Sequence, residues 1–379
     1  MTNRERLINT LNGLAVDRPA VNFYEIGSTK YNPDDPDEFN VHNAPSWREL
    51  IELAENRTDI IRLIGQRQPY GQNDIASEFL KIENWQQGRS KFTKKTISIS
   101  GNKLTELSRR DADTDTVWKL EHFIKTIDDL RAFVEIPIEV FDFEYDCEKL
   151  LGCDVELGDR GIAGFDTADP LCFVADLFSM EDFTIFALTE QKLMHSLLSK
   201  FASLIYPKVE TAVEKCPGRL WRIVGPEYAS EPYLPPSLFD EYVVGYDTHI
   251  VELIHKTGGF ARIHSHGRLK NILPLIVKTG ADGLDPIEPP MQGDVELRYV
   301  REKYGENLVL FGNLEITDIE NLPPSEFEEK VRIALEEGTM GTGRGFVLMP
   351  SASPYGRVIT ENTLENYKTM VLLTENFLE

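Results

Sequence analysis

Two histidines separated by a single serine, His264-Ser265-His266, are the residues of this sequence best suited to chemistry. If the segment from Phe260 onward is a strand, residues two apart project to the same face, so both imidazoles point the same way. Imidazole nitrogens bind divalent metals, and zinc suits a mixture of histidine and carboxylate ligands. The spacing therefore indicates a zinc site. The alternative is that the two histidines bind loop carbonyls, or a substrate carboxylate, without any metal.

A carboxylate is expected to complete this metal site. Glu227 follows an apolar run at 220–224 in the sequence Gly-Pro-Glu, where the proline stiffens a turn that presents the carboxylate. With His264 and His266 it would give three protein ligands and an open fourth position, which is typical of catalytic rather than structural zinc. Glu227 and Asp166 are also the candidates for a general acid or base, the alternative being ordinary solvated loop carboxylates.

These candidates lie at the ends of strand-like segments. Eight short apolar runs can be read as strands, at 21–26, 60–64, 162–165, 220–224, 260–264, 283–287, 308–311 and 346–349. Helical segments separate most of them, notably 191–213, 237–255, 269–278, 295–304 and 324–337. This alternation predicts an α/β fold, a distorted (β/α)8 TIM barrel. Because the active sites of such barrels lie at the carboxyl ends of the strands, we also expect substrate contacts from Glu25, Arg268, Asn313 and Ser351.

Residues 65–160 do not follow this pattern. Alternation over 94–107 around Ser100-Gly101-Asn102 predicts a β-hairpin, and Thr126 is typical of a helix start. No flexible linker flanks the stretch. We therefore expect one domain over residues 1–379, with 65–160 as a helical and hairpin insertion or elaboration within it.

The overall charge narrows the choice of partners. Forty Lys and Arg against 63 Asp and Glu give a net charge of −23, which disfavours nucleic acid and anionic membrane surfaces. No apolar run approaches the roughly 18 residues of a membrane-spanning helix. The four cysteines, Cys147, Cys153, Cys172 and Cys216, form no C-x-x-C pair and are too few for a disulfide scaffold. A reducing, cytoplasmic location is expected.

Several motifs recur in an order that characterises a known family. They are Thr2-Asn3-Arg4-Glu5-Arg6-Leu7, Asp17-Arg18-Pro19, His264-Ser265-His266-Gly267, Gly280-Ala281-Asp282-Gly283, Gly312-Asn313-Leu314 and Glu361-Asn362. This layout resembles the uroporphyrinogen decarboxylase superfamily, which includes cobalamin-dependent methyltransferases. The resemblance implies a distorted (β/α)8 barrel, a small-molecule substrate and a homodimer.

Two departures from the family pattern bear on the reaction. Family decarboxylases carry arginines just after the first strand, whereas residues 26–31 contain none. Zinc methyltransferases of the family use a His-x-Cys pair and a later Cys, whereas this sequence has His266 and, near the later position, Ala352.

Three functions remain open on this resemblance. The first is a methyltransferase or demethylase that uses a His/His/carboxylate zinc as Lewis acid and a corrinoid on a partner protein. The second is a metal-free decarboxylase acting on a carboxylated substrate, with Asp166 or Glu227 as proton donor. The third is a non-catalytic binding protein on the same fold.

Overall fold

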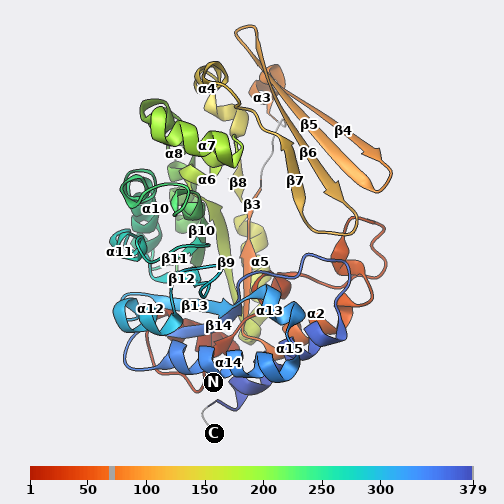
Figure 1. Cartoon of the computed structure of the whole chain (residues 1–379), viewed down its shortest axis with the longest axis vertical. Helices are drawn as coiled ribbons and strands as arrows, with labels where there is room; N and C mark the ends of the chain where they lie inside the picture. Colours follow the sequence, from red (N-terminus) through yellow and green to blue (C-terminus); the bar gives the residue numbers. More distant parts are fainter. Residues whose placement is uncertain (68–72, 378–379) are drawn as a thin grey trace.

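A computed structural model describes residues 1–67 and 73–377. Eight parallel strands form one curled sheet at its centre, in the order β1-β14-β13-β12-β11-β10-β9-β2 (Figure 1). Their bounds are β1 Ala20–Val21, β2 Ile60–Ile64, β9 Gly161–Ala168, β10 Leu220–Val224, β11 Phe260–Ser265, β12 Gly283–Pro286, β13 Val309–Leu314 and β14 Phe346–Pro350. The predicted α/β fold, a distorted TIM barrel, is confirmed.

Asp59 connects the two outer strands of the sheet, β1 and β2. Its backbone N–H donates to the Val21 carbonyl at 2.7 Å, and its Oδ2 accepts from the Val21 N–H at 2.8 Å. The carboxylate is fully buried and is also paired with Arg6 and Arg18. One charged side chain thus bridges the two outer strands through charge-assisted hydrogen bonds where no regular ladder joins them.

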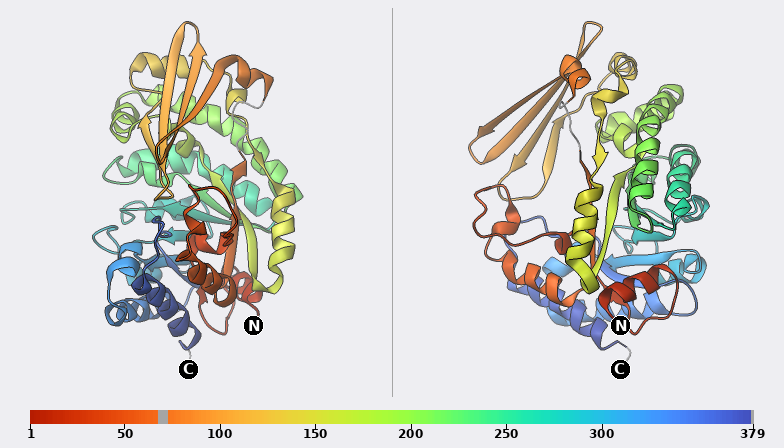
Figure 2. Two further views of the ribbon diagram at one scale, coloured as in Figure 1. Left: turned by 90° about the vertical axis from the view of Figure 1, so that its right-hand side faces the viewer. Right: turned by 180° about the vertical axis from the view of Figure 1, so that it is seen from behind.

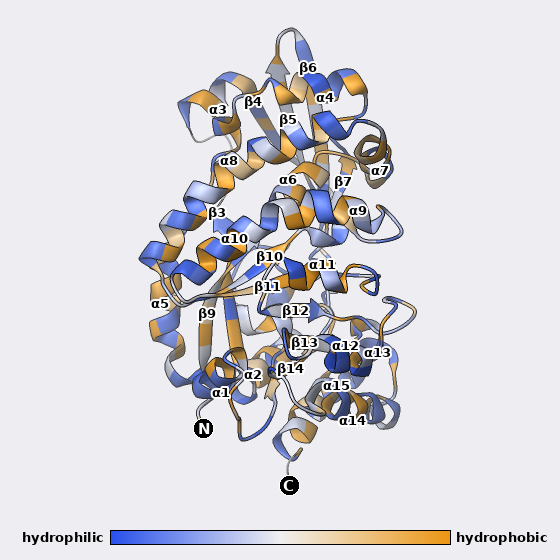
Figure 3. Ribbon diagram, turned by 90° about the vertical axis from the view of Figure 1, so that its left-hand side faces the viewer, coloured by the Kyte–Doolittle hydropathy of each residue, from blue (hydrophilic) through white to orange (hydrophobic). Residues whose placement is uncertain are grey.

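Helices cover the outside of the sheet. Their bounds are α1 Asn3–Leu11, α2 Trp47–Arg57, α3 Asp74–Phe79, α4 Ile127–Val134, α5 Cys147–Leu157, α6 Pro170–Ala175, α7 Met180–Thr189, α8 Gln191–Lys215, α9 Pro236–Phe239, α10 Gly245–Lys256, α11 Leu273–Lys278, α12 Leu297–Tyr304, α13 Ile316–Asn321, α14 Pro324–Thr339 and α15 Glu361–Glu375. Hydrophobic residues concentrate on the strands and on the inward helix faces (Figure 3). None of the helices in the described residues combines the length and apolar character needed to cross a membrane. All four cysteines are free thiols.

The lower half of the barrel interior is apolar. α1 packs Leu7 and Leu11 against side chains that point inward from the strands, among them Ile162, Leu220 and Val309. Thr2 caps this helix, and Thr2 and Glu5 form a capping box. The apolar layers fill the lumen, as in other barrels of this kind, so polar chemistry is confined to the upper half.

Two predicted elements were wrong in extent. The strand expected at 21–26 ends at Val21, and Tyr24–Ser28 form a 3-10 turn instead. Tyr24 has φ +53°, a left-handed conformation that cannot continue a strand. The helix expected at 269–278 begins only at Leu273. Asp294 Oδ1 accepts from the backbone N–H groups of Leu269 and Lys270 and holds that segment as a turn.

A four-stranded antiparallel sheet, here called the wing (residues 80–121), leans away from the barrel (Figure 2). Its strands are β4 Leu80–Gln87, β5 Ser90–Ile99, β6 Asn102–Asp111 and β7 Val117–Glu121. The hairpin predicted over 94–107 is confirmed as part of β5 and β6. A smaller pair joins β3 Gln66–Arg67 to β8 Glu144–Tyr145. The division of the chain into one domain with an insertion at 65–160 stays a prediction.

Candidate active site

A layer of charged side chains lies above the apolar part of the barrel interior. In the sheet register, Arg222 on β10 stands opposite Asp166 on one side and Arg262 on the other. The Arg222 guanidinium binds the Asp166 carboxylate through two hydrogen bonds of 2.7 and 2.8 Å. It also donates to Glu25 at 3.1 Å and lies over the Tyr24 ring. Asp166 and Glu25, both expected in the site from the sequence, are thus brought together by an arginine that the sequence analysis missed.

A second ionic group occupies β11 and β12. Arg262 is 2% exposed, and its Nε lies 3.1 Å from Asp285 Oδ1. The other oxygen, Oδ2, lies 2.9 Å from His264 Nδ1. Burial alone would raise the pKa of Asp285, but Arg262 and His264 outweigh it and lower the pKa to about 2. Asp285 is therefore ionised at neutral pH and orients the His264 ring.

His266 is oriented in the same way by a different carboxylate. Its Nδ1 lies 2.7 Å from Glu288 Oε1, while Glu288 Oε2 accepts from the Gly267 N–H at 2.7 Å. Burial works to lower the pKa of His266, but Glu288, Glu227 and Asp285 together raise it. The two imidazole rings lie with their centres 4.6 Å apart and nearly perpendicular. The predicted pairing of the imidazoles on one face is therefore present, with both Nδ1 atoms bound to carboxylates.

A cavity of about 460 Å³ lies at the mouth beside Arg222. The barrel lines it with Tyr24, Glu25, Asp166, Arg222 and Arg262, among others. The connection after β6 adds Asp115 and Thr116, which are held there by a hydrogen bond from the Asp115 N–H to the Tyr355 carbonyl. The region at 65–160 therefore contributes to the wall of this central cavity.

A second cavity, about 430 Å³, lies at the rim beside His266. Its polar lining includes His266, Glu227, Glu231 and Arg268, and Met180 and Tyr233 are among its apolar members. Glu227 and Arg268, both expected in the site from the sequence, thus line the rim cavity together with His266 and do not line the central cavity. Of the two histidines only His266 lines this rim cavity, and neither lines the central cavity.

Gly225 sets the position of Glu227. It has φ +130°, and a Cβ at this residue would lie 2.1 Å from Asp169 Oδ1. Only glycine therefore fits the turn that follows β10. The Gly225 N–H donates to Glu227 Oε2 at 3.1 Å, which fixes the carboxylate at the rim. Burial and the adjacent Asp247 raise the pKa of the Asp169 carboxyl beneath this turn.

Glu315 is a candidate that the sequence analysis missed. It follows β13 directly and is 8% exposed. Ser351 Oγ donates to its Oε2 at 3.1 Å, whereas Oε1 has no hydrogen-bond partner among the described residues. Burial and the nearby Glu288 raise the pKa of Glu315 to about 7. A carboxyl with this pKa can accept or donate a proton near neutral pH.

Two other sequence candidates lie outside the cavities. Ser351 is 2% exposed, and its hydroxyl binds Glu315 and the Ile316 N–H. Asn313 lies within β13, half-buried, and lines neither of the two cavities. Ser351 is thus placed to hold Glu315, and substrate contact by either residue stays a prediction.

The raised pKa of His266 gives the first test. Replacing Glu288 by glutamine removes the nearest negative charge, so the His266 pKa is expected to fall relative to the parent protein. A pH titration of the His266 Cε1–H resonance by NMR measures this directly. Glu296→Gln, in the loop before α12, serves as control. An unchanged His266 pKa in Glu288→Gln would contradict the pairing.

Comparison with known families identifies the fold's relatives. A family model of uroporphyrinogen decarboxylase (URO-D) matches residues 121–377, more than half of the chain. The chain belongs to the URO-D family. The match contains every strand from β9 to β14 and therefore both histidines and both arginines of the site. The resemblance inferred from the sequence motifs is confirmed.

Two solved structures were compared with this fold. A methyltransferase from Methanosarcina mazei superposes over 100% of both chains with a TM-score of 0.60 and 15% identity, which is a likeness of fold. A D-psicose 3-epimerase aligns over 56% of this chain and 88% of its own, at 9% identity and a TM-score of 0.32. A search of curated proteins found no sequence match.

Proposed function

We propose that the chain is an enzyme that transfers a methyl group between a small-molecule substrate and a corrinoid carried by a partner protein. In this proposal zinc is bound at the barrel mouth by His264, His266 and Glu227. The observation that carries the proposal is the orientation of the two histidines. Both Nδ1 atoms are bound to carboxylates, Asp285 and Glu288, so both Nε2 atoms are left for another partner. Histidines that bind metals usually have this second interaction.

The donor set fits zinc through its two histidines. Glu227 lines the same cavity as His266 and is of a type that zinc accepts, but its Oε2 is bound to the Gly225 N–H. Within residues 1–67 and 73–377, no group of three or more His, Cys, Asp or Glu side chains is gathered closely enough to hold a metal ion. Glu227 is therefore the ligand on which the zinc proposal depends.

Bound zinc would supply a Lewis acid for an ether or alcohol oxygen whose methyl group leaves. The protein's own groups have separate roles. Asp285 and Glu288 fix the two rings, and Glu227 and Asp166 are the proton donors or acceptors proposed for the leaving oxygen. The rim cavity beside His266 and the central cavity beside Arg222 and Arg262 provide space for two reactants, as a group transfer requires. The acidic surface would attract a basic corrinoid protein, with association that weakens as salt rises.

Metal analysis of the purified full-length chain tests the zinc part of the proposal. We expect about one zinc per chain, because three ligands with an open position are typical of catalytic zinc. His266→Ala and Glu227→Gln should each lose most of it. His255→Ala is the matched control, because His255 is exposed and pairs with Asp282 away from the mouth. A parent protein without stoichiometric zinc would overturn the metal claim.

A second candidate, metal-free decarboxylation, is favoured by the two arginines of the central cavity. Arg262 is buried, and its Nε is ion-paired with Asp285 Oδ1 at 3.1 Å without forming a hydrogen bond. Guanidinium groups bind carboxylates well, so a carboxylated substrate could be held here although residues 26–31 lack arginine. The purified full-length chain used for metal analysis can also distinguish methyl transfer from decarboxylation. Conversion of a porphyrinogen that persists after zinc is removed by a chelator would favour decarboxylation.

A further inference from the structure

A third cavity, about 270 Å³ and here called the base cavity, lies at the amino ends of β1 and β14. Pro19, just before β1, and Phe346, the first residue of β14, are part of its wall. Both chain termini lie at this end of the molecule (Figure 1). Because the histidine pair is at the carboxyl ends of the strands, the base cavity is separate from the candidate active site and independent of the proposed function.

The charged residues that line the base cavity are all arginines. They are Arg18, Arg301 and Arg344, and none of the described lining residues is Asp or Glu, although the chain has 63 acidic against 40 basic residues. Arg18 pairs with Asp59 at 2.8 Å, and Arg344 pairs with Asp282 at 3.0 Å. Arg301 has no carboxylate partner within residues 1–67 and 73–377. The wall therefore contains one guanidinium whose charge is not balanced.

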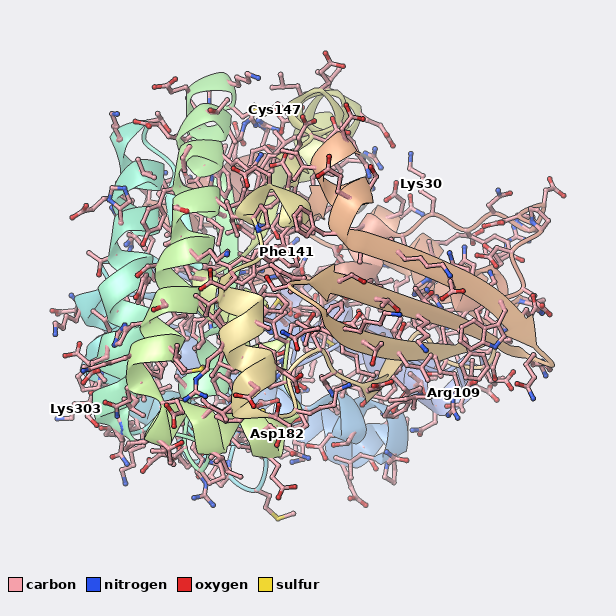
Figure 4. The ribbon with its side chains drawn as sticks, turned by 90° about the horizontal axis from the view of Figure 1, so that it is seen from above. Lys30, Arg109, Phe141, Cys147, Asp182 and Lys303 are labelled. Carbon is pink, nitrogen blue, oxygen red and sulfur yellow. The ribbon has the colours of Figure 1, made fainter. Side chains whose placement is uncertain are left out.

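Arg301 is buried on α12, two residues before Lys303, which lies across the molecule from the wing (Figure 4). It is 7% exposed, and its Nε donates to the Met340 carbonyl at 3.0 Å while its Nη1 donates to the Arg344 carbonyl. Its Nη2 donates to no acceptor in the described part of the chain. The two carbonyls hold the guanidinium in place, but they are neutral groups and do not cancel its charge.

Burial of this charge has an energetic cost. It lowers the pKa of Arg301, and no carboxylate opposes the effect. A guanidinium nevertheless stays protonated at neutral pH, so Arg301 cannot avoid the cost by losing its proton. Since an unpaired buried charge destabilises a protein, an anion bound beside Arg301 would be favourable.

The loop before β14 passes closely over Arg301 and is rich in glycine, with four glycines in residues 338–345. Gly343 has φ +147°, and a Cβ there would lie 2.6 Å from the Gly305 carbonyl oxygen and 3.3 Å from Arg301 Cζ. Only glycine allows this approach. The Gly343 N–H, in the cavity wall, has no acceptor among the described residues. Free backbone N–H groups in such loops are suited to binding anions.

We propose that the base cavity binds a phosphate group, either free or as the end group of a small ester. Arg301 Nη2 and the Gly343 N–H donate to different phosphate oxygens, and Arg18 and Arg344 add positive potential. Arginine is well matched to phosphate in geometry and charge. A group with several anionic oxygens fits this wall better than a single carboxylate does, because the donors come from two separate elements. The bound phosphate would balance the charge of Arg301 and join α12 to the loop that enters β14.

The remaining wall can accommodate the organic part of an ester. It is apolar, with Leu14, Val16, Phe346 and Phe377 among its members. Inorganic phosphate has no apolar surface to place against these side chains, whereas an ester has. The relative affinity of the two therefore identifies which form the cavity is built for.

Calorimetric titration of the full-length protein with inorganic phosphate, and separately with glycerol 3-phosphate, tests this proposal. We expect both to bind, and Arg301→Met to weaken each by about tenfold or more, since a charge-assisted hydrogen bond is lost. Arg298→Met is the matched control, because Arg298 lies on the same helix but is exposed and pairs with Glu337. Tighter binding of glycerol 3-phosphate than of phosphate identifies an ester as the ligand, and equal binding identifies free phosphate.

Ala15→Glu is a second variant that leaves the hydrogen bonds of Arg301 intact, and it decides the matter if Arg301→Met does not fold. Ala15 is an exposed part of the wall, so a carboxylate there should repel phosphate and weaken its binding without disturbing the fold. Circular dichroism melting checks that each variant is folded. A parent protein that binds neither compound overturns the proposal. Binding that Arg301→Met and Ala15→Glu weaken no more than Arg298→Met belongs to another site and overturns it equally.

Discussion

Asp285→Ala should lower the free energy of unfolding by about 3–5 kcal/mol, because it leaves a buried positive charge without its anion. Asp285 is fully buried between Arg262, which is 2% exposed, and His264. The Arg262 guanidinium has no other ion-pair partner among the described residues, and it packs over the Phe311 ring. Denaturation by urea measures the loss.

Two further variants isolate the cause of this loss. Asp240→Ala removes a carboxylate from the exposed pair with Lys278 and should cost no more than about 1 kcal/mol. The double variant Asp285→Ala/Arg262→Met removes both buried charges and should recover part of the stability lost in Asp285→Ala. An Asp285→Ala protein as stable as the parent would show that the ion pair contributes nothing to the fold.

The difference in unfolding free energy between the parent and Asp285→Ala should depend on pH in one direction. The folded pKa of Asp285, about 2, lies below its unfolded value of about 3.9, so its stabilisation is complete above the unfolded value. This stabilisation is lost as the pH falls through the folded pKa of about 2. The difference in stability between the parent and Asp285→Ala should therefore shrink between about pH 4 and pH 2.

The fold could be predicted because strand and helix periodicity are local properties of the sequence. Eight strand-like runs were placed correctly, except that the first ends at Val21, where the Tyr24 backbone conformation stops it. The wing was only partly foreseen. Its hairpin has a clear turn at Ser100-Gly101, whereas β4 and β7 lack an equally clear local signal.

The site was less predictable because its partners come from different strands. The imidazole pair followed from a spacing of two residues. The strand-end rule also selects Asp285 and Glu288, but not which ring each of them holds, because they lie 21 and 22 residues further along the chain. The same spacing rule could have identified Arg262 from the sequence. If His264 points into the barrel, Arg262 two residues earlier must do so as well. Attention to strand ends alone missed it.

Glu315→Gln should make the protein more stable than the parent at alkaline pH. The folded pKa of Glu315, about 7, lies above the ordinary value of 4.5, so the folded state favours the protonated carboxyl. The stability that depends on this proton is complete below about pH 4.5 and is lost as the pH rises through 7. Glutamine does not titrate, and its neutral amide resembles the protonated acid.

The expected difference in unfolding free energy grows by up to about 3 kcal/mol in favour of Glu315→Gln between pH 5 and pH 9. Urea denaturation at a series of pH values measures it, and titrating groups common to both proteins cancel in the difference. Glu329→Gln, on the exposed side of α14, is the matched control and should show no such trend. Parallel pH profiles for parent and Glu315→Gln would mean that this carboxyl is ionised in the folded protein at neutral pH. Glu315 could then not serve as a proton donor to a group bound beside His266 and Glu288, because a donor must hold its proton at the working pH.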